Sequence, residues 1–147
     1  MITVEPLSHP TPEEKSRILS IYHQQKWWPE TLSDPERIGQ MIRGSHCYVV
    51  ARDKREIIGI GRALSDGVGD AYLHDITVVK SHRRQGVGRQ IVAMLMERLE
   101  KDGITWMGLI AEKGSPALYR KFGFTALEGA IPMFRFETDP TETSFTS

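Results

Sequence analysis

The chain has 147 residues, of which 39% are hydrophobic and 26% charged, and its formal net charge is zero. Its length is that of one globular domain, and the balanced charge gives no reason to expect nucleic acid or a membrane surface as a partner. No stretch approaches the roughly 18 apolar residues of a membrane span, and the first residues lack the pattern of a signal peptide. The single cysteine, Cys47, excludes an intramolecular disulfide and a cysteine-rich metal site. We therefore expect a cytoplasmic protein without a bound metal, in which Cys47 is a small buried hydrophobe.

The N-terminal third predicts one short strand followed by two helices. Residues 2–5 alternate weakly between apolar and polar, as a short strand does. A helix should begin after Thr11, a good N-cap residue that is followed by proline and two acids, and run to about residue 25. A second, shorter helix should open around residues 33–36 and stop at Gly44.

The middle of the chain predicts a hairpin, a long strand and an amphipathic helix. Residues 46–52 and 56–64 resemble strands on either side of a tight turn at Asp53 and Lys54. Residues 71–79 are predicted to form the longest strand. A helix should follow over residues 86–100, because apolar residues recur on one face from Val87 to Leu99.

The C-terminal third predicts two further strand regions around a short helix. Residues 104–110 are apolar at nearly every position, which indicates a strand covered on both faces. A short helix should span residues 116–121, and residues 124–136 should form a final hairpin. We expect one domain over residues 1–136 and a flexible tail over 137–147, where Thr, Glu and Ser predominate.

The junction between the long strand and the helix after it has the composition of an anion site. No acidic residue occurs from 76 to 96, whereas Lys80, Arg83, Arg84 and Arg89 are cationic. Glycines let backbone N–H groups approach a ligand, and a helix start adds partial positive charge. The pattern predicts a phosphate or pyrophosphate site. It is neither a P-loop nor a dinucleotide fingerprint, since Ile91 stands where the third glycine of the latter would be.

Two segments resemble the signatures of the GNAT superfamily of N-acetyltransferases. Residues Arg83-Arg84-Gln85-Gly86-Val87-Gly88 match the Arg/Gln-x-x-Gly-x-Gly/Ala motif that cradles the acetyl-CoA pyrophosphate in that superfamily. Residues 118–124, Leu-Tyr-Arg-Lys-Phe-Gly-Phe, are similar to its Leu-Tyr-x-Lys-x-Gly-Phe segment. The resemblance covers roughly residues 46–126, and the two motifs stand in the right order with a strand between them.

The resemblance implies both a fold and a cofactor. The fold is α+β, an α/β sandwich in which a mixed, mostly antiparallel sheet of six to seven strands is splayed at its centre and flanked by about four helices. Acetyl-CoA would be the co-substrate, with no metal. The implied cofactor-binding residues are Ile76, Thr77 and Val78 along pantetheine, Arg83, Arg84, Gln85, Gly86, Val87, Gly88 and Arg89 around the pyrophosphate, then Tyr119, and Glu112 where many relatives carry Asn.

Tyr119 falls on the tyrosine of the second motif, which the resemblance places at the CoA sulfur. There it would donate a hydrogen bond, or a proton, to the departing thiolate. A hydrogen bond is favoured, because a phenol with a pKa near 10 is a weaker acid than a thiol near 8.5. The alternative is that Tyr119 only packs beside Phe122.

The general base has two candidates, Asp75 and His74. An alkyl amine has a pKa near 10, so a base is needed to remove its proton. Neighbours on a strand point to opposite faces, so we expect that the two cannot serve the same site. We favour Asp75, acting through water, over His74. A structural role for Asp75, binding backbone N–H groups where the sheet splays, is the alternative.

Acceptor recognition is expected from the N-terminal third. Trp27 and Trp28 lie where relatives have the acceptor-side wall, and they could sandwich an apolar or cationic group or only pack in the core. Asp75 would also contact the acceptor. Acidic residues at 66, 70, 75 and 112 favour a cationic acceptor, whereas Arg62 could pair with a substrate carboxylate.

These observations favour an acyltransferase that moves an acetyl group from acetyl-CoA directly to a primary amine of a small molecule, in a ternary complex. The alternatives are a protein acetyltransferase that modifies lysine or an N-terminal amine, and a non-catalytic acyl-CoA-binding sensor. The partner would be the small-molecule amine. Homodimers are frequent among GNAT proteins, and residues 131–136 are a candidate interface.

Overall fold

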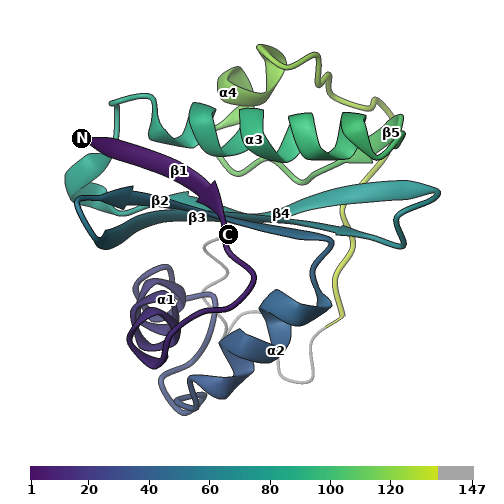
Figure 1. Ribbon diagram of the computed structural model, residues 1–147. Coiled ribbons are helices and arrows are strands. Elements are labelled where there is room, and N and C mark those ends of the chain that lie inside the picture. Colours follow the sequence, from purple (N-terminus) through teal and green to yellow (C-terminus); the bar gives the residue numbers. More distant parts are fainter. Residues whose placement is uncertain (136–147) are drawn as a thin grey trace.

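The structure is a computed structural model that describes residues 1–135. These residues form one sheet between two helical layers (Figure 1). The strands lie in sequence order across the sheet: β1 (Ile2–Pro6), β2 (Cys47–Asp53), β3 (Glu56–Ser65), β4 (Asp70–Val78) and β5 (Trp106–Gly108). Helices α1 (Pro12–Gln24) and α2 (Glu36–Gly44) cover one face, and α3 (Val87–Lys101) and α4 (Pro116–Arg120) cover the other. The α+β class is confirmed, and within residues 1–135 no helix is long and apolar enough to cross a membrane.

Helix α1 begins where the sequence predicts. The Thr11 hydroxyl accepts a hydrogen bond from the Glu14 amide, and the Glu14 carboxylate accepts one from the Thr11 amide, which together form a capping box. Its buried face carries Ile18 and Tyr22, which are at most 1% exposed. The apolar stripe therefore turns Tyr22, with its hydroxyl, toward the sheet.

Helix α3 packs closely on the sheet because β3 has glycines beneath it. A Cβ placed on Gly61 would lie 2.6 Å from Ile91 Cγ2, and one on Gly59 would lie 2.9 Å from Ile91 Cδ1. Ile91 and Leu95 are fully buried there. This contact fixes the start of α3 relative to the end of β4, which positions the predicted anion site.

Strands β4 and β5 are parallel neighbours over only part of their length. They pair from Asp70 opposite Trp106 to Tyr72 opposite Gly108, and the ladder ends there. Beyond Tyr72, the β5-facing edge of β4 has no strand beside it in the described part of the chain. The expected splay is thus present, but in the described sheet it lies between β4 and the edge strand β5 rather than at the centre, and it leaves an open backbone edge at Ile76–Val78.

A β-bulge interrupts the pairing of β4 with β3. Ile60 pairs with Thr77 and Arg62 pairs with His74, so that Asp75 and Ile76 lie opposite Gly61 alone. Asp75 has a φ of 57°, in the left-handed region that few non-glycine residues adopt. The bulge shifts the alternation of side chains along β4 by one residue.

Three predictions about the strands are wrong. Strand β3, with 10 residues, is longer than β4, with 9. Strand β5 has 3 residues rather than seven, and Trp106 is 56% exposed and Ile110 41%, because β5 is an edge strand with one neighbour. Residues 124–135 form no strand, so the described sheet has five strands rather than six or seven. The predicted tail, 137–147, lies outside the described residues.

Candidate active site

The connection from β4 to α3 presents a row of unpaired backbone donors. It makes one 3-10 turn at Lys80–His82, and then Arg84 and Gly86 take left-handed conformations with φ of 64° and 80°. Gly86 is the N-cap of α3, and the first helical bond is donated by the Gln90 amide to the Gly86 carbonyl. Within residues 1–135, the amides of residues 86–89 therefore have no hydrogen-bond acceptor. These are the donors that bind phosphate at helix N-termini.

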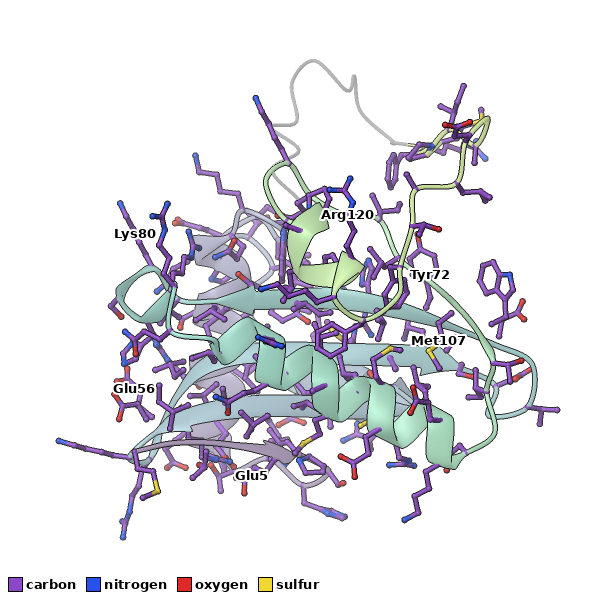
Figure 2. The ribbon with its side chains drawn as sticks, turned by 90° about the horizontal axis from the view of Figure 1, so that it is seen from above. Glu5, Glu56, Tyr72, Lys80, Met107 and Arg120 are labelled. Carbon is purple, nitrogen blue, oxygen red and sulfur yellow. The ribbon has the colours of Figure 1, made fainter. Side chains whose placement is uncertain are left out.

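Arg83 is anchored to the end of β4. Its Nε donates a hydrogen bond of 2.8 Å to the Val78 carbonyl, which holds the guanidinium between the open edge of β4 and the unpaired amides. Gly88 lies beside these groups, because a Cβ placed on it would be 3.6 Å from Leu118 of α4 and 3.8 Å from Val78. Figure 2 shows Lys80 at the β4 end of this connection and Arg120 on α4, beside α3.

His82 does not contribute a free cation to the site. Its Nε2 lies 2.8 Å from Asp53 Oδ2, in the turn between β2 and β3. This interaction, together with the charge of His82, holds the pKa of Asp53 below its usual value. An acidic residue from another part of the chain therefore lies beside this run, but within residues 1–135 neither Arg83 nor Arg84 forms an ion pair with a carboxylate.

Tyr119 and Glu112 lie across the splay from β4. Tyr119 is 9% exposed, and its ring contacts Phe124 edge-on with a centroid distance of 6.2 Å. Burial, assisted by the charge of Glu112, raises the pKa of Tyr119 to about 12. Burial also raises the pKa of Glu112, against the opposing charge of Arg83. Arg83, Glu112 and Tyr119 therefore belong to one electrostatic cluster at the predicted cofactor site.

His74 and Asp75 lie together, against the prediction that they point to opposite faces. His74 Nδ1 is 2.8 Å from Asp75 Oδ1, because the bulge places both side chains on the α1/α2 face. The His74 side chain is 49% exposed and that of Asp75 is 10% exposed. The exposed His74 and the largely buried Asp75 therefore form one contacting pair rather than two separate candidates for the base.

Asp75 is fully engaged by donors. Its Oδ2 accepts a hydrogen bond of 2.6 Å from the Tyr22 hydroxyl and one of 2.8 Å from Arg62 Nε. Burial alone would raise the pKa of Asp75, but the hydrogen bonds and charges of His74, Tyr22 and Arg62 bring it below its usual value. Asp75 is thus a poor proton acceptor by itself, and Arg62 is paired with Asp75 rather than free for a substrate carboxylate.

The two tryptophans pack on Tyr22. The Tyr22 ring centroid is 5.3 Å from that of Trp27, edge-on, and 4.9 Å from that of Trp28. Both tryptophans are half-buried, so each keeps part of its surface accessible. The expected negative bias of the acceptor side is weaker than predicted, because Asp75 is neutralised by Arg62 and Asp66 binds the amides of its own turn.

Sequence reasoning missed Tyr22 and the pairing of Arg62 with Asp75. Tyr22 reads as one member of the apolar stripe of α1, and no local signal marks its hydroxyl as a partner of a residue 53 positions later. Cys47 is buried, as expected. No group of three or more His, Cys, Asp or Glu side chains among residues 1–135 is arranged to hold a metal ion.

Comparison with known proteins gives a family match over most of the chain. The model of the acetyltransferase (GNAT) domain matches residues 7–132. Histone acetyltransferase TAP1 of Glycine max is 34% identical over 94 residues, which are 63% of this chain and 40% of that protein. GCN5-related N-acetyltransferase 1, chloroplastic, of Arabidopsis thaliana is 32% identical over 79 residues, 54% of this chain and 40% of that protein. The chain thus spans about 40% of the length of these two relatives.

Solved structures share the fold. A probable acetyltransferase from meticillin-resistant Staphylococcus aureus superposes with a TM-score of 0.75 and 26% identity, covering 92% of this chain and 99% of that one. An aminoglycoside 6'-N-acetyltransferase complexed with coenzyme A gives a TM-score of 0.65 and 22% identity, covering 75% and 62%.

Proposed function

This chain belongs to the GNAT family of acetyltransferases, and we propose that it transfers the acetyl group of acetyl-CoA to a primary amine of a small molecule. Acetyl-CoA is the co-substrate that family membership assigns. The observation that carries the proposal is the row of four unpaired amides at the start of α3, residues 86–89, with Arg83 anchored beside it. Amide donors and a helix N-terminus suit the two phosphates of CoA, and the exposed Arg84 adds a charge.

The open edge of β4 would bind pantetheine. No strand lies on the β5 side of Ile76, Thr77 and Val78, so an extended chain can add to this edge as a strand. The Val78 carbonyl would then be shared between Arg83 and the added chain. Glu112 lies on the opposite side of the splay, with Tyr119. The thioester would then lie between the bulge of β4 and the Tyr119 hydroxyl.

The chemistry follows from this arrangement. The acceptor ammonium loses one proton, the neutral nitrogen attacks the thioester carbon, the C–N bond forms and the C–S bond breaks. The nitrogen loses its second proton as the thiolate leaves. The pKa of Tyr119 is about 12, whereas that of a thiol is near 8.5, so full proton transfer from Tyr119 to the thiolate is uphill by roughly 5 kcal/mol. Tyr119 therefore stabilises the thiolate as a hydrogen-bond donor.

The first proton would go to His74. Two tautomers compete at His74: Nδ1 can donate to the Asp75 carboxylate at 2.8 Å, or accept from Arg62 Nη2 at 3.4 Å. The reaction uses the first, in which Nδ1 faces the nearer, charged partner and Nε2 carries the free lone pair. The exposed His74 side chain can meet the acceptor, whereas Asp75 is occupied by three partners. Within the pair, His74 accepts the proton and Asp75 orients it. Transfer is direct, because the only thiol, that of Cys47, is buried, and the charged groups beside it are Arg98 and Asp102 of the α3 end.

A small-molecule acceptor is supported by Trp27 and Trp28, which pack on Tyr22 next to the bulge and would form a wall for a small ligand. The aminoglycoside acetyltransferase shares the fold, whereas TAP1 is named a histone acetyltransferase, which supports the protein-directed alternative. A cytoplasmic location is part of the proposal, although the Arabidopsis thaliana relative is named chloroplastic. The proposal also includes a homodimer, whose interface would use the exposed apolar side chains of Ile131 and Met133.

The test measures acetyl-CoA binding by calorimetry and CoA release with spermidine, glucosamine, tryptamine, kanamycin and a lysine peptide. Arg83→Ala and Arg84→Ala should each weaken acetyl-CoA binding about 5- to 150-fold, as the loss of a charge-assisted hydrogen bond does. Arg37→Ala is the matched control, because Arg37 is exposed on α2, on the other face of the sheet. Unchanged binding in both loop variants would refute the pyrophosphate site. Tight binding without CoA release on any amine would instead favour the sensor.

A further inference from the structure

The Tyr22 hydroxyl is buried between the acceptor side and the bulge of β4. It lies 2.6 Å from Asp75 Oδ2, 3.2 Å from Met41 Sδ and 3.4 Å from the Tyr48 hydroxyl. We propose that Tyr22 is a positioning residue for acetyl transfer. Its hydroxyl and Arg62 both bind the Asp75 carboxylate, which reduces the negative charge beside His74. Its ring packs against Trp27 and Trp28 and holds them in place. This role rests on the proposed function, because it acts through His74.

Tyr22 is the donor in its bond to Asp75. Burial, followed by the nearby Tyr48 and the charge of Asp75, raises the pKa of Tyr22 well above its usual value, so the phenol keeps its proton. A carboxylate is the strongest acceptor within its reach, since thioether sulfur and a second phenol accept weakly. The bond therefore fixes Asp75 Oδ2 and leaves Oδ1 for His74.

The negative charge of a carboxylate beside an imidazole makes the ring a stronger base, but it also stabilises the imidazolium, which cannot take a proton from an acceptor amine. Tyr22 and Arg62 draw part of that charge onto Oδ2. The other groups that face His74 are Arg62, whose Nη2 is 3.4 Å from Nδ1, and the Tyr72 ring at 6.4 Å. Asp75 thus contacts His74 through Oδ1 while Tyr22 and Arg62 hold Oδ2.

The same residue also sets the acceptor wall. The Tyr22 carbonyl accepts hydrogen bonds from the amides of Trp27 at 3.1 Å and Trp28 at 3.5 Å, and its ring packs against both indoles. Tyr22 therefore contacts both parts of the proposed acceptor site. Its ring and carbonyl hold the two tryptophans, and its hydroxyl binds Asp75, which contacts His74. An acceptor that rests on the tryptophans is placed in a fixed relation to His74.

The test is an NMR titration of the His74 ring in the free protein, assigned with His74→Gln. Tyr22→Phe keeps the ring and removes the hydroxyl, so the titration midpoint should move to higher pH by about half a unit to one unit, the equivalent of one hydrogen bond. Tyr48→Phe removes a hydroxyl from the same buried cluster without a bond to Asp75, and its midpoint should equal that of the wild type.

Kinetics give the second readout, with acetyl-CoA and whichever of the five acceptors the wild type turns over fastest. In Tyr22→Phe the acid limb of the kcat/KM profile should move upward with the midpoint, while the amine KM changes less than about twofold because the ring remains. A midpoint that is unmoved, or moves to lower pH as a loosened Asp75 would cause, overturns the role of Tyr22. A wild type that turns over no amine overturns the proposed function instead, whatever the titration gives.

Discussion

At the scale of single residues, Tyr119 is the side chain next to the proposed thioester site to which we assign a direct role in the reaction. It is held on α4, the short helix that begins with Pro116 and is followed by Gly123, and its carbonyl accepts the amides of Phe122 and Phe124. The backbone therefore fixes the ring, and no hydrogen-bond partner for its hydroxyl occurs within residues 1–135. The hydroxyl is available to a ligand.

Tyr119→Phe should lower kcat for acetyl transfer roughly 10- to 1000-fold, because it removes the donor that stabilises the thiolate. The ring contact with Phe124 is kept, so the melting temperature and the affinity for acetyl-CoA should stay near the wild-type values. Stopped assays of CoA release, with calorimetry for binding, provide the comparison. A variant with wild-type kcat would remove Tyr119 from the reaction.

Residue chemistry was more predictable than residue geometry. Motifs mark Arg83, the glycines of the loop and Tyr119, and the structure brings Arg83 and Tyr119 into electrostatic contact with the same residue, Glu112. Their roles as cofactor-binding and catalytic residues stay predictions. His74 and Asp75 were also recognised as candidates, but regular alternation put them on opposite faces. The bulge depends on the pairing of β4 with β3 and on the left-handed backbone of Asp75, and the local sequence predicts neither.

At the scale of elements, the contact between α3 and β3 decides where the cofactor loop lies. The first turn of α3 supplies the unpaired amides, and Ile91, one turn further on, packs directly over Gly59 and Gly61. A displaced helix would carry the amides away from the edge of β4. The glycines of β3 therefore determine where the proposed cofactor loop lies, because α3 packs directly on them.

Gly61→Ala should destabilise the protein by about 1–3 kcal/mol, because its Cβ would lie 2.6 Å from Ile91 in a packed core. It should also weaken acetyl-CoA binding, because α3 must shift. Gly44→Ala is the matched control, since a Cβ there meets no atom within 4 Å. Urea denaturation of both variants makes the comparison, and equal stability of the two would show that α3 does not depend on this close approach.

The elements themselves followed from the sequence where their periodicity is long. Helices α1 and α3 begin within a residue or two of the predicted starts, because α1 has both a cap and an apolar stripe and α3 has a long apolar stripe. The error is concentrated after Gly103, where short apolar runs such as 104–110 do not reveal how many neighbours a strand has. Burial at a sheet edge is a property of the whole fold.

At the scale of the whole molecule, carboxylates connect the layers. Asp102 at the end of α3 pairs with His46 before β2, Asp53 pairs with His82, and Asp75 joins β4 to α1 and β3. The pKa of each of these three carboxylates is held below its usual value by its partners. Only the Asp75 side chain is largely withdrawn from solvent, so the other two pairs contribute little to stability.

Asp75 should therefore contribute to the acid stability of the fold, as should Glu14, which pairs with Arg52 and whose pKa is also held below its usual value. A carboxylate whose folded-state pKa is depressed contributes stability that is present above its unfolded pKa, near 3.9, and is lost as the pH falls through the folded value. Asp75→Asn should be less stable than the wild type by roughly 2–4 kcal/mol at pH 7, because it leaves Arg62 without its counter-charge. That difference should shrink below about pH 4, as the wild type takes up the proton.

Urea midpoints measured from pH 7 to pH 2.5 would follow this convergence. Asp66→Asn is the control, because Asp66 is an exposed turn residue whose oxygen binds two amides and whose amide replacement can do the same. Its curve should stay within about 0.5 kcal/mol of the wild type at neutral pH. If the gap between Asp75→Asn and the wild type stayed constant down to pH 2.5, the loss would come from packing and not from the charge that joins α1, β3 and β4.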